Sequence, residues 1–528
     1  MHICLIQIIS IKMKTVYLVL LYVLISTCAI SQQRSFEITM DVSNLDKVAG
    51  VVEDNNGNFI AATTTFLGSN YDITLVKFSS LGVVIDSKRI GTADAEFAKS
   101  ICRTSDGGFF ITGYAYSTST DNDALAIKVD SNFTIQFFKR YGIVGENDYA
   151  NEGFEALPGN YTFTGTIAIG GSTKPAMVVL NSVGNVIRES YLNTNQFASP
   201  DYRGTYLGDG TVGYAHLANA ISILDTLGNI IKNINYGFGY SSAIIKSSDG
   251  QLAAIGTTVV GGLQGSSLAF CKGNLATGLL SYTQKYSVIG SNFLSVGIVQ
   301  DLDNNYYLGA NLQSFGSGFS NPVVIKIDSI GNIIWVNQYT PSVANDCQLH
   351  SIILTSDEGI LISGSSLSGG NTDLFFAKID SLGSSTCNTI PLVVAQAAFV
   401  PVSANPHTVN GGALGSIGVT TITDTVVAVS PNILCITTNT SSIDFDNEQI
   451  FVYPTVASSY LNFSNQEHVQ RMRVIISDVF GRGIFYKKTI SSDEKIEIGN
   501  LNIGIYLVNI TNTETEKTLN QKIVIVKE

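Results

Sequence analysis

Short apolar runs alternate with turn-forming residues along most of the chain between residues 36 and 385. The clearest stretch is residues 98–141, where four runs rich in β-forming side chains are separated by polar segments. The first two runs are joined by Ser105-Asp106-Gly107-Gly108. Runs of this length, bounded by Gly, Asn and Asp, are typical of short strands. The pattern therefore predicts a unit of four strands.

This unit of about fifty residues recurs seven times. A tight turn between the first and second strands lies at Asn56-Gly57, Asp106-Gly107, Pro158-Gly159, Asp209-Gly210, Asp249-Gly250, Asn304-Asn305 and Asp357-Glu358. A second turn, between the third and fourth strands, begins at Ser79, Asp130, Asn181, Asp225, Gly273, Asp328 and Asp380. These residue types tolerate positive φ or close tight turns, so both positions have a mechanical reason. The fourth unit is shortened, and the second turn of the fifth is degraded.

The strands are apolar enough to be covered on both faces, as in residues 323–328 and 374–380. A single four-stranded sheet cannot cover both of its own faces. Sheets stacked around an axis bury each face against a neighbour and leave only short edges. The chain is therefore predicted to be all-β, with a seven-bladed β-propeller over residues 36–385.

Composition narrows the function classes. Charged residues make up 14% of the chain and the formal net charge is −12. A nucleic-acid-binding protein normally has a basic face, so nucleic acid is not an expected partner. No long amphipathic helix pattern interrupts the repeats.

The N-terminus predicts export. A short basic region after Met13 precedes an apolar run, and the small-residue site Ala29-Ile30-Ser31 follows. This order of segments is typical of a cleaved signal peptide over residues 1–31, with Met13 as the better start. Its removal would leave no transmembrane segment in the mature chain. An alternative is a lipoprotein box in which Cys28 carries the lipid.

Residues 386–445 are rich in Thr, Val and Ser, nearly uncharged and interrupted by prolines. They predict a spacer with some β-structure that forms one small unit. Cys387 and Cys435 bracket this segment and are the expected disulfide pair in an exported protein. Cys102 and Cys271 are expected to be buried strand cysteines.

Residues 446–528 carry a second signal, an ordered set of strand and turn motifs. Its marker residues are Tyr453, Pro454, Asp478, Gly481, Leu501, Gly504, Tyr506 and Lys522. The set resembles the type A C-terminal sorting domain of the type IX secretion system of Bacteroidetes. That family usually opens with Tyr-Pro-Asn-Pro, whereas this chain has Thr455-Val456 after Pro454.

The resemblance implies a small Ig-like β-sandwich and a route through the periplasm and the type IX machinery. The product would be displayed on the outer-membrane surface or released. The blades also resemble the repeat propellers that commonly precede such domains, which implies little about substrate.

The search for catalytic chemistry gives weak candidates. Cys347 and His350 lie close in sequence to Asp346 and suggest a nucleophile–base pair, but a cluster at a strand edge is the favoured interpretation, because such sites are recognised by geometry and not by proximity in sequence. Asp301, Asp303 and Asn305 have a fragment of calcium-loop spacing without its distal Glu, so calcium is the one candidate cofactor.

Four positions resemble the Asp-Ser/Thr-aliphatic sites that are O-glycosylated in exported Bacteroidetes proteins: Thr226, Ser329, Ser381 and Thr425. Three of them coincide with the second turn of a blade, which explains the pattern without glycosylation.

The leading hypothesis is a non-enzymatic surface or released module that binds a glycan or a protein through loops at one end of the channel. The loops around residues 170–172 and 261–263 are the expected contact points. One alternative is a polysaccharide hydrolase whose carboxylates converge from several blades. Another is a structural spacer.

Overall fold

The computed structural model describes residues 34–525, apart from several internal gaps. The gaps are residues 117–120, 194–202, 217–219, 236–239, 260–264, 315–318, 341–345, 369, 386–388, 399–407, 412–414, 418–421, 439–449, 454–455, 458–459, 466–471, 479–482, 488–494, 499–500, 502–503 and 513–517. The predicted signal peptide, with Met13 and Cys28, lies outside the described residues.

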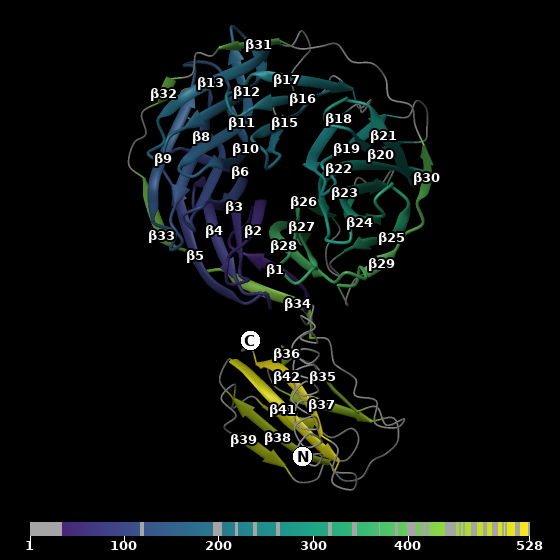
Figure 1. The fold of residues 1–528 in the computed structure, drawn as a ribbon. Coiled ribbons are helices and arrows are strands. Elements are labelled where there is room, and N and C mark those ends of the chain that lie inside the picture. The colour runs from purple at the N-terminus through teal and green to yellow at the C-terminus, as the bar shows by residue number, and fades with distance from the viewer. Residues whose placement is uncertain are drawn as a thin grey trace, which may run out of the picture. The chain divides into compact units, whose positions relative to one another are not determined.

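Seven antiparallel sheets are arranged around a central axis, which confirms the predicted seven-bladed propeller (Figure 1). Blades 1 and 2 are β2 (Asp46–Glu53), β3 (Phe59–Leu67), β4 (Asn70–Phe78), β5 (Val84–Gly91) and β6 (Ala95–Arg103), β7 (Phe109–Tyr116), β8 (Asn122–Val129), β9 (Ile135–Gly142). Blades 3 and 4 are β10 (Tyr149–Leu157), β11 (Asn160–Ile169), β12 (Ser172–Leu180), β13 (Val186–Asn193) and β14 (Arg203–Tyr206), β15 (Thr211–His216), β16 (Ala220–Asp225), β17 (Ile230–Asn235). Blades 5 and 6 are β18 (Tyr240–Lys246), β19 (Leu252–Val259), β20 (Ser266–Gly273), β21 (Leu280–Ser287) and β22 (Ser291–Gln300), β23 (Tyr306–Ser314), β24 (Ser320–Ile327), β25 (Ile333–Tyr339).

The seventh blade closes the ring with a strand from the other end of the propeller. It joins β26 (Asp346–Leu354), β27 (Ile360–Ser368) and β28 (Asn371–Ile379) to β1 (Arg34–Asp41). β1 pairs antiparallel with β28, so the purple N-terminal strand in Figure 1 lies beside green ones. Each blade therefore begins where the predicted turns place it, and the fourth strand of blade 7 comes from the N-terminal end of the propeller.

The two repeated turns behave as the sequence predicts. All seven first turns contain a residue with positive φ, at Gly57, Gly107, Gly159, Gly210, Gly250, Asn304 and Glu358. All seven second turns do so as well, at Gly82, Phe133, Gly184, Gly228, Gly278, Gly331 and Gly383. In the fifth blade the turn has moved to Gly278, which is why the sequence pattern there is degraded.

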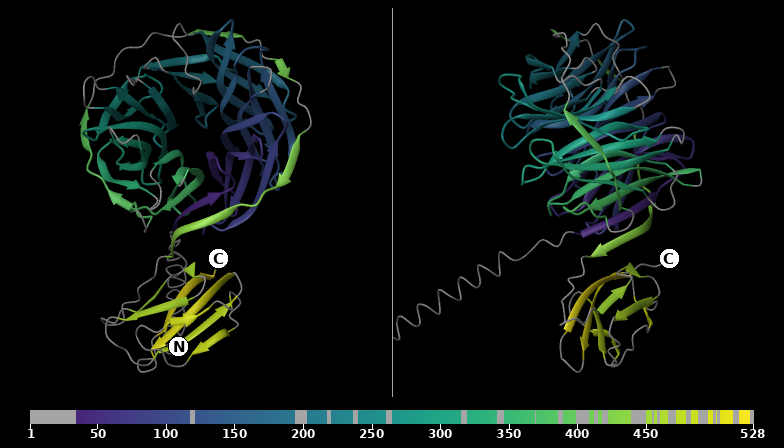
Figure 2. Two further views of the ribbon diagram at one scale, coloured as in Figure 1. Left: turned by 180° about the vertical axis from the view of Figure 1, so that it is seen from behind. Right: turned by 90° about the vertical axis from the view of Figure 1, so that its right-hand side faces the viewer.

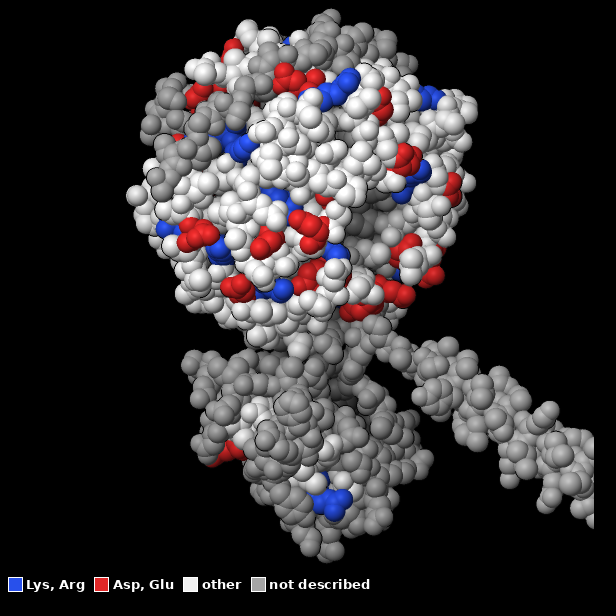
Figure 3. Space-filling view, turned by 60° about the vertical axis from the view of Figure 1, so that its left-hand side comes forward, with Lys and Arg blue, Asp and Glu red and all other residues white. Residues whose placement is uncertain are grey.

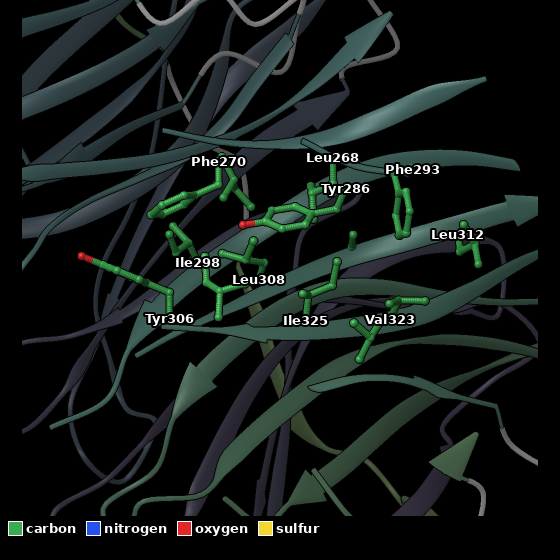
Figure 4. Close-up of a cluster of buried hydrophobic side chains, with 14 of the residues drawn as sticks. Leu268, Phe270, Tyr286, Phe293, Ile298, Tyr306, Leu308, Leu312, Val323 and Ile325 are labelled. Carbon is green, nitrogen blue, oxygen red and sulfur yellow. The ribbon is translucent and has the colours of Figure 1, made fainter. Parts of the chain in front are cut away.

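Apolar side chains from adjacent blades interlock to form the core. Between blades 5 and 6, for example, Phe270 and Tyr286 pack against Tyr306 and Leu308, and all four are fully buried (Figure 4). Two small clusters join blades 3 and 4, one of which centres on Phe154, Met177 and Val212. Among the described side chains, the shortened fourth blade thus has a sparse interface with blade 3.

Polar contacts repeat between blades. The hydroxyls of Tyr141, Tyr286 and Tyr339 donate to the carbonyls of Gly184, Gly331 and Gly383 at 2.7–2.8 Å, each reaching the second turn of the next blade. At the first turns, Ser356 of blade 7 donates through its amide and hydroxyl to Glu53 of blade 1 at 2.7 and 2.5 Å. This last contact joins residues 303 positions apart, so it also closes the ring.

A lysine on the third strand is paired with the aspartate of the first turn in five blades. The pairs are Lys77–Asp54, Lys128–Asp106, Lys272–Asp249, Lys326–Asp301 and Lys378–Asp357. Lys128 is fully buried, with its Nζ 2.8 Å from Asp106 Oδ2, whereas the Asp106 side chain is 45% exposed. Burial opposes ionisation of Asp106, but hydrogen bonds from Lys128, Thr104 and Gly108 outweigh it and lower the pKa to about 2.

Residues 386–445 form a belt around the propeller. Its strands are β29 (Thr389–Pro391), β30 (Ala395–Ala398), β31 (Thr408–Gly411), β32 (Gly415–Ile417), β33 (Thr423–Val426) and β34 (Ser430–Thr438). They pair in turn with blades 6, 5, 3, 2, 1 and 7, each adding a fifth, outermost strand (Figure 2). Among the described residues, blade 4 has no such strand. The segment is therefore not one small separate unit, because its strands complete the edges of other sheets.

The C-terminal part forms two further sheets. One contains β35 (Ile450–Tyr453), β37 (Tyr460–Asn465) and β40 (Lys495–Glu497). The other contains β36 (Val456–Ala457), β42 (Thr518–Ile525), β41 (Gly504–Asn512), β38 (Met472–Asp478) and β39 (Gly483–Lys487), in that order. Four apolar side chains of these strands are fully buried: Leu461, Val474, Ile476 and Val508.

Neutralising one partner of the Lys128–Asp106 pair is expected to have unequal effects. Asp106→Asn leaves a buried ammonium without its carboxylate and should lower the free energy of unfolding by about 3 kcal/mol. Lys128→Met should cost about 1 kcal/mol, because the remaining carboxylate is half exposed to water. Chemical denaturation measures both, with Asp424→Asn in the solvent-exposed Lys88 pair as control. A larger loss for Lys128→Met than for Asp106→Asn would contradict this account.

The belt is expected to protect the outer strands. A chain ending at Ser385 should show faster amide exchange in β5, β9, β13, β21, β25 and β1, because their outer edges become open to water. β17 should be unchanged, since no described belt strand covers it. Hydrogen exchange with mass spectrometry measures this, and an equal increase in β17 would show that the belt does not act strand by strand.

Candidate functional site

The first strands of all seven blades surround a central cavity of about 560 Å³. Six of these strands carry a β-bulge at the same level, with extra residues Ala49, Lys99, Asn151, Ser242, Val296 and His350. A bulge re-aims a side chain that regular pleating would turn toward the neighbouring blade. Lys99 and His350 line the cavity for this reason.

A second cavity of about 590 Å³ adjoins the first and shares Ala49, Lys99, Arg203 and His350 with it. Its wall includes the rings of Tyr71, Phe97 and Tyr114. Phe97 and Tyr114 are stacked, with centroids 4.7 Å apart and planes at 10°, and Tyr71 lies 5.0 Å from Phe97. Phe66 and Tyr149 extend the series at its two ends. These five half-buried rings, drawn from blades 1, 2 and 3, are called the aromatic row.

Three cations stand beside the aromatic row: Lys47, Lys99 and Arg203. The Lys99 Nζ lies 5.8 Å from the centre of the Tyr114 ring. Burial and then the charges of Lys47, Arg203 and Lys99 lower the pKa of His350 to about 3, so this imidazole is neutral at pH 7. Its Nε2 lies 3.0 Å from the Ser365 hydroxyl.

The acids that line the cavities are engaged within the fold. Asp46 accepts hydrogen bonds from the amides of Val42 and Ser43 at 2.8 and 2.9 Å. Glu53 accepts from Ser356, as described above. Glu152 accepts from the Ser100 hydroxyl at 2.8 Å and lies 3.9 Å from Arg203 Nη1. Burial raises the pKa of Glu152, and Arg203 partly opposes that rise.

Another group of carboxylates lies where the blades connect, away from the cavity walls. Asp148 accepts from the amides of Ile143 and Ala168 at 2.8 and 2.9 Å and so ties the connection between blades 2 and 3. Asp123, 3% exposed, has one carboxylate oxygen without a hydrogen-bond partner. Burial, followed by the charge of Asp121, raises the pKa of Asp123 to about 6.

The structure does not assemble the Cys347–His350 pair into a nucleophile and base. Cys347 is 1% exposed, and burial raises the pKa of its thiol well above the usual value. His350 bonds to Ser365 on the neighbouring strand. Cys271 is buried and Cys102 half-buried, and both are free thiols.

The calcium candidates lie on the first turn of blade 6. Asp301 accepts from the amide of Asn305 at 2.8 Å and pairs with Lys326 at 3.3 Å, and Asp303 is exposed. Within the described part of the chain, no three His, Cys, Asp or Glu side chains gather closely enough to hold a metal ion. Calcium binding here stays a prediction from the sequence.

The remaining sequence candidates are scattered. Thr226, Ser329 and Ser381 lie on second turns and Thr425 on the exposed belt strand β33, so the glycosylation prediction stays open. Cys387 and the Cys435 side chain lie outside the described residues, as does the predicted contact loop 261–263. The loop at residues 170–172 lies apart from the cavity linings.

Comparisons with known proteins identify the C-terminal region. Residues 451–526 match the family model described as "Secretion system C-terminal sorting domain". The C-terminal region is a type IX secretion sorting domain. The chain is therefore exported to the cell surface or beyond it, as the sequence predicts, and its origin is in the Bacteroidetes.

The marker residues of the sorting domain are distributed over both of its sheets. Asp478 at the end of β38 is paired in register with Tyr506 of β41, and Lys522 of β42 with Leu507. Tyr453 ends β35, Gly504 begins β41, and the Leu501 amide donates to Ile498 at 2.9 Å. Pro454 and Gly481 lie outside the described residues.

For the whole chain, no curated protein matches. Two solved structures share the general architecture at 11% identity. "The crystal structure of BamB from Moraxella catarrhalis" covers 62% of this chain and 85% of that one, with a TM-score of 0.36. "Crystal Structure Of The C-Terminal WD40 Domain Of Sif2" covers 63% and 81%, with a TM-score of 0.39. Neither likeness carries a functional argument.

No described residue belongs to a helix with the length and apolar character needed to span a membrane.

Asp123 is expected to make the folded state less stable as the pH rises. Its folded pKa of about 6 lies above the unfolded value near 4, so the folded state holds the extra proton between these limits. The stability contributed by this group should fall as pH rises from about 4 to about 6, then stay constant. Between pH 4 and pH 7, the free energy of unfolding of Asp123→Asn should therefore rise by about 2 kcal/mol relative to that of the parent.

Chemical denaturation at several pH values measures this difference. The Asp86→Asn variant, at an exposed position on β5 of blade 1, is the control for removal of a surface carboxylate. A constant difference between Asp123→Asn and the parent would contradict the assignment.

Proposed function

We propose that the exported propeller is a glycan-binding protein that holds a saccharide chain against the aromatic row at the second cavity. The single observation that carries the proposal is the row itself: five half-buried aromatic rings in series, of which Tyr71, Phe97 and Tyr114 line the second cavity. Contiguous apolar surface that stays partly exposed is typical of ligand-binding sites. Sugar rings present flat C–H faces that pack against aromatic rings, and their hydroxyls bond to polar groups at the edge.

The polar groups at the edge support this proposal. Thr64 and Thr372 line the same cavity together with Lys47 and Lys99. Ligand sites are typically concave and largely apolar, with a small number of placed polar groups that fix orientation. The rings are held from three different blades, so the surface is rigid before the ligand arrives, which limits the entropy lost on binding.

The hydrolase alternative is less well supported. A glycosidase needs two carboxyl groups flanking one sugar linkage, about 5–10 Å apart. Burial raises the pKa of Glu152 and raises that of Asp46 to about 6, so two cavity acids are suited to proton donation. Among the described lining residues, Glu53 is the remaining acid, and both Asp46 and Glu53 are engaged by backbone amides.

The test is retention of the full exported chain on a glycan array, with and without Tyr114→Leu. Leucine keeps an apolar side chain in place but removes the stacking face, so affinity should fall roughly tenfold, about 1.4 kcal/mol. Tyr282→Leu, on the exposed outer strand β21, is the matched control and should bind like the parent.

An equal loss for Tyr282→Leu would remove the aromatic row as the site. Release of oligosaccharides from a retained polysaccharide would favour the hydrolase instead. Absence of retention on every glycan would overturn the proposed function.

A further inference from the structure

The wall shared by the two cavities concentrates positive charge in an acidic protein. The formal net charge of the chain is −12, and Figure 3 shows acidic and basic side chains interspersed on a largely uncharged surface. At the shared wall, however, Lys99 and Arg203 stand together, and Lys47 joins them in the second cavity. Asp46 is the one acid lining the second cavity, and it is 1% exposed.

We propose that this wall, formed by Lys47, Lys99, Arg203 and His350, binds an anionic substituent of the saccharide, either a carboxylate or a sulfate group. The inference rests on the proposed function and specifies its ligand class: an acidic polysaccharide. The anion would reach the wall while the sugar ring that carries it packs on the aromatic row.

Geometry joins the two parts of the site. Lys99 lines both cavities, and its Nζ lies 5.8 Å from the Tyr114 ring centre. A sugar packed on Tyr114 therefore carries its ring substituents within reach of this ammonium group. Arg203 enters from blade 4 and Lys47 from blade 1, so the cations approach the same space from different sides.

The electrostatic effect on His350 supports the convergence. Burial lowers the pKa of His350, and the charges of Lys47, Arg203 and Lys99, which line the same cavity from three other blades, lower it further. Glu152 lines the first cavity, and its Oε2 lies 3.9 Å from Arg203 Nη1. The excess of positive charge therefore lies on the side of the second cavity. Charge of one sign inside a low-dielectric cavity draws oppositely charged ligands.

Acidic groups engage such a site better than hydroxyls do. Hydrogen bonds from lysine or arginine to an anion are shorter and stronger than those between neutral groups. The neutral imidazole adds a polar group without a further charge to be desolvated. Neutral glycans would keep the stacking contacts and lose only this contribution.

The experiment compares matched polysaccharides that differ only in charge, using the full exported chain. The two pairs are polygalacturonate against its methyl ester, and dextran sulfate against dextran. At least one acidic form should bind ten or more times more tightly than its neutral partner, and 1 M NaCl should remove most of that advantage, because salt screens the attraction. The pair that shows the advantage distinguishes carboxylate from sulfate.

Substitutions locate the effect. Lys99→Gln and Lys47→Gln should each reduce the ratio of acidic-form to neutral-form affinity at least fivefold. Lys285→Gln, on the outer strand β21, is the control and should change neither. Circular dichroism and the melting temperature of each variant confirm that it is folded.

The outcomes separate the two proposals. Equal binding of the acidic and neutral forms would overturn the anion site and leave glycan binding in place. A preference that persists in both lysine variants, or that Lys285→Gln also removes, would overturn the location. Absence of binding to every polysaccharide would overturn both.

Discussion

Closure of the ring is the constraint on which the rest of the structure depends. Each blade is covered by its neighbours, so an open array would leave an apolar face at either end. The chain prevents this by placing β1 beside β28, and the cluster around Phe36, Ile38 and Phe376 then seals blades 7 and 1. The Ser356–Glu53 hydrogen bonds reinforce the same seam. The belt strand β34 then pairs along the whole of β1, which leaves the closing strand internal to its sheet.

The candidate site is a consequence of that closure. Its side chains come from blades 1, 2, 4 and 7, which meet at one cavity beside the axis only because the ring is closed. Bulges on the first strands then turn Lys99 and His350 toward the axis. A regular strand would have placed every second side chain against an adjacent blade, where a charged group is costly to bury. The irregularity of these strands is thus what makes a polar channel compatible with an apolar core.

Much of the fold could be predicted from the sequence, because its determinants are local. A turn that needs positive φ leaves Gly or Asn behind, and all fourteen such turns, two in each blade, are where the sequence places them or within a few residues. The motifs of the sorting domain predict that domain in the same way. The Lys–Asp pairs could also have been found, since a lysine precedes the second turn at a fixed offset, as in Lys128-Val129-Asp130.

The belt and the site could not be predicted, because they depend on contacts between distant segments. Strand β33, for example, is four residues long and exposed, and its Thr423 pairs with Gly91, 332 residues earlier. Residues 386–445 therefore look like a spacer. Tyr71, Phe97 and Tyr114 are ordinary β-forming residues, and their contact across two blades appears only when the sheets are stacked.

The fourth blade connects stability to binding. Its strands are four to six residues long, its clusters with blade 3 are small, and no described belt strand covers it. It nevertheless supplies Arg203 to the wall shared by the two cavities. A ligand held by Arg203 together with Lys99 would tie this sparsely supported blade to a well-supported one. Because a ligand stabilises the state that binds it, occupation of the site would strengthen the ring at its weakest blade.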